Sequence, residues 1–457
     1  MVNTQTRINP FPGLRPFDVT QSHLFFGRDG QTDEILKRLR QHKFLAIVGT
    51  SGSGKSSLVR AGLLPSLHSG FMVQAGSSWR VAVMRPGDSP IANLSQALND
   101  PEVFGVEGDD AHLYALFTET TLRRGALGLV EVTQQARMSP YENLLVVVDQ
   151  FEELFRFKQS LQNKDAGDEA SAFVKLLLAA TQQDTVPIYV VLTMRSDFLG
   201  DCSQFRDLPE ALNDSQYLVP RMTRDQRQSA IEGPVAVGGA TIAPRLVNRL
   251  LNDMGDNPDQ LPILQHALMR TWDVWEQDHA PDEPIDLRHY DATGGMAKAL
   301  SNHADEIYHG LSDDRSRHIC ELMFKRLTEK ASDGRGIRRP TRIQEICAVA
   351  GATPAEVIAV ANAFRGAGKS FLMPPVKQTL NEQTLLDISH ESLMRVWQRL
   401  DDWVDEEGRS AQIYRRLAET ASMHEQGRAG YLRDPELGIA LNWREENQPN
   451  EAWAERY

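Results

Sequence analysis

The first half of the chain alternates short apolar runs with longer stretches of helical periodicity. The apolar runs lie at residues 45–48, 81–84, 144–149 and 188–193, and each is nearly continuous. A strand that is buried on both faces of a parallel sheet has this pattern, whereas a half-exposed strand alternates between apolar and polar residues. The pattern therefore predicts an α/β fold in which helices sandwich a parallel sheet, and we expect it to occupy residues 23–222.

Beyond residue 223 the strand pattern stops and helical spacing takes over. We expect a small helical lid domain at residues 223–292, where apolar side chains recur at helical intervals: Leu246, Leu250, Leu261, Leu264, Leu268 and Trp272. Residues 293–405 repeat the helical pattern and then carry two short apolar runs, at 371–374 and 385–388, which predict a β-ribbon. Helices followed by a ribbon are typical of a winged helix, so we expect a winged-helix domain there.

Two terminal segments complete this organisation. Residues 1–22 are rich in proline and turn formers, which predicts an irregular arm against the first domain. Residues 406–457 contain Ile413, Leu417 and Ala421 at intervals of four, which predicts a C-terminal helical segment. The sequence thus predicts three domains with a segment at each end.

The first apolar run leads into a glycine-rich turn, and this turn is the strongest chemical signal in the chain. It fits the P-loop pattern G-x-x-x-x-G-K-[ST] and reads Gly49, Thr50, Ser51, Gly52, Ser53, Gly54, Lys55, Ser56 and Ser57. Between a strand and a helix, such a turn surrounds phosphate groups with backbone N–H groups, and the helix dipole adds positive potential. Lys55 would contact the β- and γ-phosphates, and the Ser56 hydroxyl would bind Mg²⁺. The turn predicts binding of a nucleoside triphosphate.

The third apolar run ends in carboxylates. Asp149 follows residues 144–148, and Gln150, Glu152 and Glu153 come shortly after it. On a strand beside the P-loop strand, Asp149 can hold Mg²⁺ through water, and a nearby glutamate can orient the attacking water. Many P-loop ATPases place that glutamate directly after the aspartate, but Gln150 occupies this position here. The sequence leaves the choice between Glu152 and Glu153 open.

Residues on either side of these motifs can complete a nucleotide site. Arg195 follows the fourth apolar run, where an arginine can report the presence of a γ-phosphate; the alternative is a surface arginine paired with Asp197 or Asp201. Three residues before the P-loop strand can close over the adenine, or can form an ordinary turn with a docked ring; they are Phe26, Gly27 and Arg28.

Composition restricts the setting in which such a protein works. The formal net charge is -13, which disfavours broad attachment to nucleic acid or to anionic membranes. The three cysteines are well separated and match neither a disulfide framework nor a metal-ligand spacing, so we expect a reducing cytoplasm. No apolar run approaches the length of a membrane span. One basic run can grip DNA phosphates or pair internally, and it comprises Arg335, Arg338, Arg339 and Arg342.

In order along the chain, these motifs resemble the signal-transducing ATPases with numerous domains, called STAND, a class that includes the NACHT and apoptotic-ATPase groups. The opening residues 9–17 (NPFPGLRPF) are similar to those of the novel STAND branch, found mainly in bacteria. The resemblance implies two more nucleotide contacts. Pro262 would touch adenine, in a motif that begins here with Gln260 instead of glycine, and His390 would contact the β-phosphate of ADP. Alternatively, His390 caps the start of a helix.

The resemblance implies an ATP/ADP-dependent switch in signalling or defence that hydrolyses ATP slowly and self-associates in its ATP state. It also implies a sensor of an unknown ligand or protein beyond the C-terminal segment. Two alternatives from other classes stay open: an ATP-dependent DNA-binding regulator or loader, and a scaffold that binds nucleotide without hydrolysis. Retention of Asp149, Glu152 and Glu153 argues against the scaffold, and the acidic charge argues against DNA.

Overall fold

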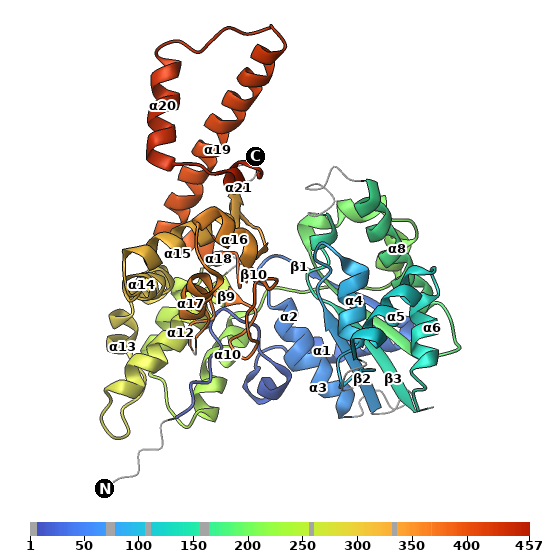
Figure 1. Cartoon of the computed structure of the whole chain (residues 1–457). Coiled ribbons are helices and arrows are strands. Elements are labelled where there is room, and N and C mark those ends of the chain that lie inside the picture. The colour runs from blue at the N-terminus through green and yellow to red at the C-terminus, as the bar shows by residue number, and fades with distance from the viewer. Residues whose placement is uncertain are drawn as a thin grey trace. The chain divides into compact units, whose positions relative to one another are not determined.

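The computed structural model describes residues 7–69, 78–105, 111–139, 141–155, 164–255, 260–330, 336–366 and 368–457. The chain divides into two compact units (Figure 1). The α/β unit contains Pro16–Val237, and the helical unit contains Gly238–Gly255 and Pro262–Tyr457 together with the arm up to Arg15. The domain boundaries at residues 222, 292 and 405 remain predictions, because most of the predicted lid belongs to the same compact unit as the predicted winged helix.

The α/β unit is built on a five-stranded sheet in which every neighbouring pair is parallel. Its strands are β1 (Phe44–Gly49), β2 (Ser78–Met84), β3 (Glu142–Val148), β4 (Ile188–Arg195) and β5 (Gln216–Leu218). The spatial order is β2-β3-β4-β1-β5. The predicted parallel sheet is confirmed, but the placement of β3 beside the P-loop strand is wrong, because β4 pairs with both β1 and β3 and separates them.

Helices cover both faces of this sheet, which explains why its strands are continuously apolar. On β1, Phe44, Ala46 and Val48 join one core, whereas Leu45 and Ile47 join the other. The first core is completed by α4 (Pro90–Leu98), α5 (Ala111–Arg123), α6 (Gly128–Gln135), α8 (Lys164–Thr181) and α9 (Leu208–Asp214). The second is completed by α1 (Asp29–His42), the π-helical turn η2 (Leu58–Leu63) and α3 (Leu64–His68).

Short elements complete the α/β unit. They are η1 (Val19–Leu24), α2 (Lys55–Ser57), η3 (Ser196–Phe198), η4 (Gly200–Gln204) and α10 (Arg224–Val237). Helix α10 packs against η1, and its Gly233 permits this contact: a Cβ there would lie 2.5 Å from a ring carbon of Phe26.

The helical unit begins with four helices: α11 (Pro244–Asp253), α12 (Gln260–Gln277), α13 (Leu287–Ala292) and α14 (Gly295–His309). The arm packs here too, because Asn9 Nδ2 donates to Met269 O and Asp273 Oδ1 of α12 at 2.9 and 2.8 Å. Leu14 lies in the core of the same unit. The arm was expected against the first domain, but residues 9–14 pack in the helical unit, through the contacts of Asn9 with α12 and the burial of Leu14.

A mixed segment follows, with α15 (Asp314–Arg326), β6 (Thr328–Lys330), β7 (Gly336–Arg338), β8 (Thr341–Arg342), α16 (Ile343–Ala350), α17 (Pro354–Arg365), β9 (Leu372–Met373), β10 (Leu385–Ile388) and α18 (Ser392–Val396). The predicted ribbon is confirmed as β9 paired antiparallel with β10, and β8 adds to the other edge of β10. The order helix, strand, helix, helix, hairpin supports the winged-helix assignment, which remains a proposal.

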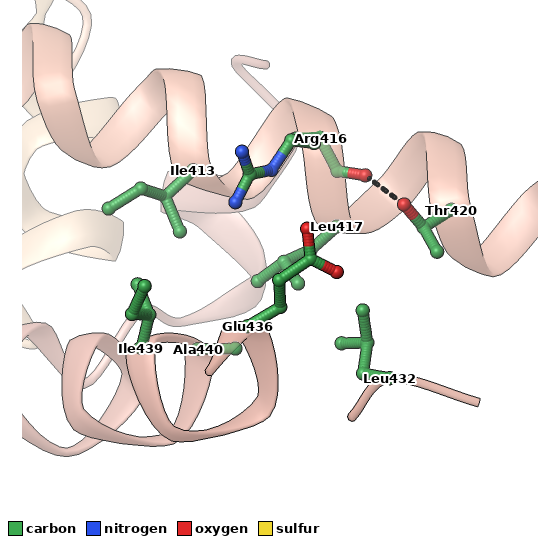
Figure 2. Close-up of a pocket in the computed structure, with 8 residues that line it drawn as sticks. All are labelled: Ile413, Arg416, Leu417, Thr420, Leu432, Glu436, Ile439 and Ala440. Atoms are coloured by element: carbon green, nitrogen blue, oxygen red, sulfur yellow. Dashed lines mark hydrogen bonds between the residues drawn. The ribbon is translucent and has the colours of Figure 1, made fainter. Parts of the chain in front are cut away.

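The last part of the chain is α19 (Gln398–Glu425), α20 (Glu436–Asn447) and α21 (Glu451–Ala454), and α19 and α20 form a hairpin (Figure 1). Ile413 and Leu417 of α19 face Ile439 of α20 across a cavity of about 60 Å³ (Figure 2). The predicted helical periodicity of Ile413, Leu417 and Ala421 is therefore confirmed. In the described part of the chain no single helix is long and apolar enough to cross a membrane. Helices α16 and α17 together have the required length and apolarity, but the pair is bent by 113°.

Candidate nucleotide site

The glycine-rich turn has the backbone of a phosphate-binding loop. It leaves β1 at Gly49, and Gly52 and Gly54 adopt φ values of 70° and 88°, which residues with a side chain rarely adopt. The helix begins directly afterwards at Lys55, and Gly54 is its N-terminal cap. Unbonded N–H groups of this first turn therefore point out of the helix end, as an anion requires.

Lys55 is held at the mouth of this loop. Its Nζ donates to Gly49 O at 2.9 Å and to Thr50 O at 2.8 Å. Burial lowers the pKa of the ammonium, and the nearby carboxylates of Glu152 and Asp149 oppose that shift. The lysine is thus a half-buried cation near two carboxylates, at a position where a polyphosphate that approaches the loop would meet its charge.

Two other serines of the turn differ in their contacts. Ser57 Oγ accepts from the backbone N–H of Phe17 at 3.2 Å, which ties the arm to the P-loop helix. The Ser53 hydroxyl is buried and has no hydrogen-bond partner among the described residues. A buried hydroxyl without a partner costs about 1–3 kcal/mol, so this atom suits a phosphate oxygen. Thr50 and Ser51 lie in the loop between these contacts.

Asp149 anchors the metal side of the site. Its Oδ1 accepts from Ser56 Oγ at 2.8 Å and from Thr193 Oγ1 at 2.6 Å, and its Oδ2 lies 3.5 Å from Arg60 Nη2. Burial acts to raise the pKa of Asp149, but Arg60, Arg85 and the two hydroxyl donors outweigh it, so the pKa lies below its usual range. The carboxylate is therefore ionised at neutral pH.

The oxygen atoms of Ser56 and Asp149 suit Mg²⁺, which prefers one or two carboxylates or hydroxyls together with substrate phosphates and water. Their separation of 2.8 Å brings two hard oxygen donors to one point beside the loop. No group of three or more His, Cys, Asp or Glu side chains that could hold a metal occurs among the described residues. Ser56 and Asp149 are therefore a candidate pair of oxygen ligands for Mg²⁺.

The chain turns sharply after Asp149. Gln150 has φ 59° in the left-handed region, and its backbone N–H donates to Thr193 Oγ1 at 3.0 Å. This corner buries the two glutamates that follow: Glu152 and Glu153 are 5% and 7% exposed. Glu153 Oε2 accepts from Gly87 N at 3.1 Å, whereas Glu152 Oε2 accepts from Arg195 N at 3.4 Å and acts on Lys55. Glu152 therefore lies toward the Lys55 side of this edge.

Arg195 lies at the tip of β4, between the two motif strands. Its guanidinium pairs with Asp197 and lies 5.7 Å from the ring centroid of Phe198. This pair is the alternative contact that the sequence left open. The position still brings the arginine to the edge of the sheet that carries Lys55 and Asp149.

Of the three residues expected to cover adenine, Phe26 and Gly27 are half-buried and Arg28 is buried. Gly27 has φ 84°, and a Cβ there would meet Gln226 O at 2.5 Å, so only glycine fits. Arg28 is 4% exposed and donates to Ser53 O at 2.8 Å, Pro220 O at 2.8 Å and Gln31 Oε1 at 2.7 Å. Arg28 therefore fixes the P-loop backbone, a role that the sequence did not reveal.

Pro262 and His390 lie in the helical unit. Pro262 is in the first turn of α12, where proline is tolerated. His390 precedes α18, and its Nδ1 accepts from Ser392 N at 3.1 Å. This contact is the helix-capping alternative left open by the sequence, and the nucleotide contacts of both residues stay predictions.

Sequence reasoning missed Thr193 and Arg60 as partners of Asp149. Thr193 occupies the last position of a predicted strand, where a hydroxyl reaches the sheet edge. Arg60 lies five residues after Lys55, and the π-helical turn that contains it follows α2 directly. Insertions of this kind are frequent at functional sites but have no sequence pattern of their own.

The basic run proposed for DNA is used within the protein. Arg338 is buried and donates to Asp387 Oδ2 at 2.8 Å and Ile388 O at 2.9 Å. Arg342 donates to Gln383 O at 3.2 Å, and Arg335 lies outside the described residues. Internal pairing, the second of the two alternatives, is thus confirmed for Arg338. To bind a DNA phosphate, this side chain would have to leave its buried position and its contacts with Asp387 and Ile388.

A phosphate loop between the first strand and helix of a parallel sheet, with a buried carboxylate facing its serine, defines a P-loop NTPase. The chain belongs to the novel STAND NTPase 1 family, whose model matches residues 10–430. The resemblance stated from the motifs is therefore confirmed. No curated protein matches the chain.

Several solved structures show distant similarity. The ORC2 protein of Aeropyrum pernix in its ADPNP-ADP complexes is 12% identical, with a TM-score of 0.43, and the match covers 83% of this chain and 94% of that chain. Cdc6p from Pyrobaculum aerophilum is 14% identical, with a TM-score of 0.34 and coverages of 83% and 94%. Domain III of the Thermotoga maritima replication initiation protein DnaA is 14% identical, with a TM-score of 0.32 and coverages of 64% and 96%.

Proposed function

We propose that the protein is an ATP- and ADP-dependent molecular switch that binds ATP and hydrolyses it slowly. One observation carries this proposal: the Ser56 hydroxyl that follows the loop lysine donates to Asp149, and the next motif strand, β4, supplies Thr193 to the same carboxylate. A phosphate loop, a metal carboxylate and an arginine at the strand tip then share one edge of the sheet. Such an edge can distinguish a triphosphate from a diphosphate.

Each residue has a distinct task in this proposal. The loop N–H groups and Lys55 bind the phosphates, and the Ser56 and Asp149 oxygens hold Mg²⁺. The bound ion would neutralise charge that develops on the transferred phosphate. Thr193 orients Asp149, because its hydroxyl donates to that carboxylate while accepting from Gln150 N.

Glu152 is the residue we assign as the base that orients the attacking water. Among the nearby charged groups, the Glu152 carboxylate does most to raise the pKa of Lys55 against the effect of burial. It also accepts a hydrogen bond from the backbone N–H of Arg195. Glu153 instead accepts from Gly87 N, a contact that holds the loop after β2. The two neighbouring glutamates therefore divide into a catalytic and a positioning role.

Arg195 is the residue we assign to sensing the γ-phosphate. When ATP binds, Arg195 would leave Asp197 and contact the oxygen atoms of the γ-phosphate, because arginine binds phosphate through a planar fork of N–H donors. With ADP the arginine stays on Asp197. We further propose that His390 holds the ADP state closed, that ATP favours an open and self-associating state, and that a region beyond this chain senses the activating ligand.

Single-turnover ATP hydrolysis by matched variants tests the assignment. Glu152→Gln should bind ATP as the wild type does yet lose hydrolysis by roughly a hundredfold or more, the scale expected for a general base. Glu153→Gln is the control, since it has the same chemical change one residue away, and it should keep most of the rate. If Glu152→Gln hydrolysed ATP at the wild-type rate, the catalytic role of Glu152 would be refuted. Separate titrations with ATP and with GTP identify the nucleobase that the protein prefers.

A further inference from the structure

Three arginines meet at the end of α15, far along the chain from the P-loop. Arg326 is the last residue of α15, and Arg339 follows β7, with its backbone N–H on Leu327 O at 2.8 Å. Arg456 comes from the C-terminal residues and donates to Lys325 O at 3.1 Å. All three belong to the helical unit, so this cluster is separate from the nucleotide site of the α/β unit.

Several N–H groups of the cluster are buried and lack a partner. Among the described residues, no acceptor is within hydrogen-bond reach of Arg326 Nε and Nη1, Arg339 Nη1 or Arg456 Nε. The side chains of Arg326 and Arg456 are only 9% and 3% exposed. More than nine in ten buried polar groups in proteins are bonded, and buried cations are paired. Four such donors in one place call for an acceptor with several oxygens.

Carboxylates lie near the cluster, but none of the described ones accepts from the four buried N–H groups. Glu345 lies 3.5 Å from Arg326 Nη2, and Glu407 lies 3.9 Å from Arg456 Nη1. Glu407 Oε1 is also engaged by Trp453 Nε1 at 2.9 Å.

The electrostatics of the cluster agree with this geometry. Burial lowers the pKa of Arg339 to about 10, the positive charges of Arg456 and Arg326 add to that shift, and Glu345 and Glu329 oppose it only in part. The pKa of Arg326 is lowered for the same reasons, first by burial and then by Arg456. The arginines repel one another in the absence of an anion.

We propose that Arg326, Arg339 and Arg456 form a second anion site in the helical unit, which binds a phosphate group of free orthophosphate or of a small phosphate ester. A tetrahedral phosphate offers three or four acceptor oxygens in different directions, so it can take N–H donors from arginines that come from three segments. Such a ligand would join α15, the β6–β7 hairpin and the C-terminal residues. It would therefore make the packing of the last helices dependent on an anion.

Calorimetric titration of the full chain with inorganic phosphate tests this site. The experiment uses the Lys55→Ala background, which weakens the P-loop as a competing phosphate site, and holds ionic strength constant with chloride. Arg339→Gln in this background should weaken phosphate binding by roughly ten- to hundredfold, since one charge-assisted contact is lost. Arg409→Gln is the matched control, because Arg409 is an exposed residue of the same unit and the change removes equal charge. Arg339→Lys should recover only part of the affinity, because it keeps the charge without the fork.

Thermal unfolding gives a second, independent readout. Without phosphate, Arg339→Gln should raise the unfolding midpoint of the helical unit, because one of three repelling charges is removed; a purely structural arginine would lower it. With phosphate, the wild type should instead unfold at a higher temperature than Arg339→Gln. The proposal would be overturned if Arg339→Gln and Arg409→Gln bound phosphate with equal affinity. It would also be overturned if chloride alone stabilised the protein as much as phosphate does. Tighter binding of orthophosphate than of glycerol phosphate identifies the free ion as the ligand, and the opposite order identifies an ester.

Discussion

Replacing Arg28 with alanine should loosen the P-loop before any nucleotide is present. The guanidinium is almost fully buried and makes three hydrogen bonds, one of them to Ser53 O inside the loop. Alanine removes all three and leaves the carbonyls of Ser53 and Pro220 without these donors. A role confined to adenine binding would predict no effect on the nucleotide-free protein, so the two roles are separable.

The magnitude follows from two opposing quantities. Hydrogen bonds from a charged donor are worth about 1.5–3 kcal/mol each, or roughly 5–9 kcal/mol for three. Burial lowers the pKa of Arg28 from 12.5 to about 10, which corresponds to a cost of about 3 kcal/mol for keeping the charge buried. The difference predicts that Arg28→Ala destabilises the α/β unit by about 2–6 kcal/mol, which for a unit of this size is a fall in its unfolding midpoint of about 4–24 °C.

Thermal unfolding of nucleotide-free protein measures this effect, and Arg38→Ala provides the control. Arg38 lies on α1, the helix whose N-cap residue is Arg28, and it also donates to a backbone carbonyl, Gln216 O at 2.8 Å, but its side chain is 39% exposed. An exposed pair contributes about 0–1 kcal/mol, so this variant should shift the midpoint little. If Arg28→Ala and Arg38→Ala unfold at the same temperature, the P-loop does not depend on Arg28 and our reasoning is wrong.

Three further predictions concern binding, pH and the switch. Lys55→Ala should weaken ATP and ADP binding by roughly tenfold or more, as one charge-assisted contact is lost; unchanged affinity in calorimetry would contradict the P-loop assignment. Burial lowers the pKa of His266 to about 3 and of His303 to about 2, and Arg270 adds to both shifts. Because the unfolded chain takes up these protons below pH 6.5 and the folded chain does not, the helical unit should lose stability as pH falls from 6.5, and His303→Gln should flatten that slope in denaturant titrations. His390→Ala should destabilise the closed ADP state by about 1–2 kcal/mol and shift the population five- to thirtyfold toward the open state; light scattering that shows wild-type size, together with wild-type ADP affinity, would leave His390 as a helix cap.

The sequence predicted the parts of the fold that are decided locally. Strands β1, β3 and β4 could be located because burial on both faces makes them nearly continuously apolar, and β2 because its last four residues are apolar. Gly52, Gly54 and Lys55 form a turn whose chemistry is contained in consecutive residues. Strand β5 (Gln216–Leu218) was missed because a three-residue edge strand with a polar first residue has no such pattern. The order of the strands was also beyond reach, since it depends on pairing between segments far apart in the chain.

The same distinction separates the site residues that could be predicted from those that could not. Asp149 was identified because it follows an apolar strand directly. The partner of Arg28, Pro220, is 192 residues away in sequence, and only the folded chain shows that the arginine clamps the loop. The cluster of Arg326, Arg339 and Arg456 was missed for the same reason, because its members come from three segments and no spacing relates them.

The central place of β4 has a consequence for how this site can vary. Because β4 pairs with both β1 and β3 along their length, the distance between the end of the P-loop strand and the end of the Asp149 strand is set by backbone hydrogen bonds and not by loops. Substitutions in the loops at that edge can therefore change their own surroundings while Ser56 and Asp149 keep their spacing. We expect these loops to tolerate changes in sequence and length more readily than the ends of the strands.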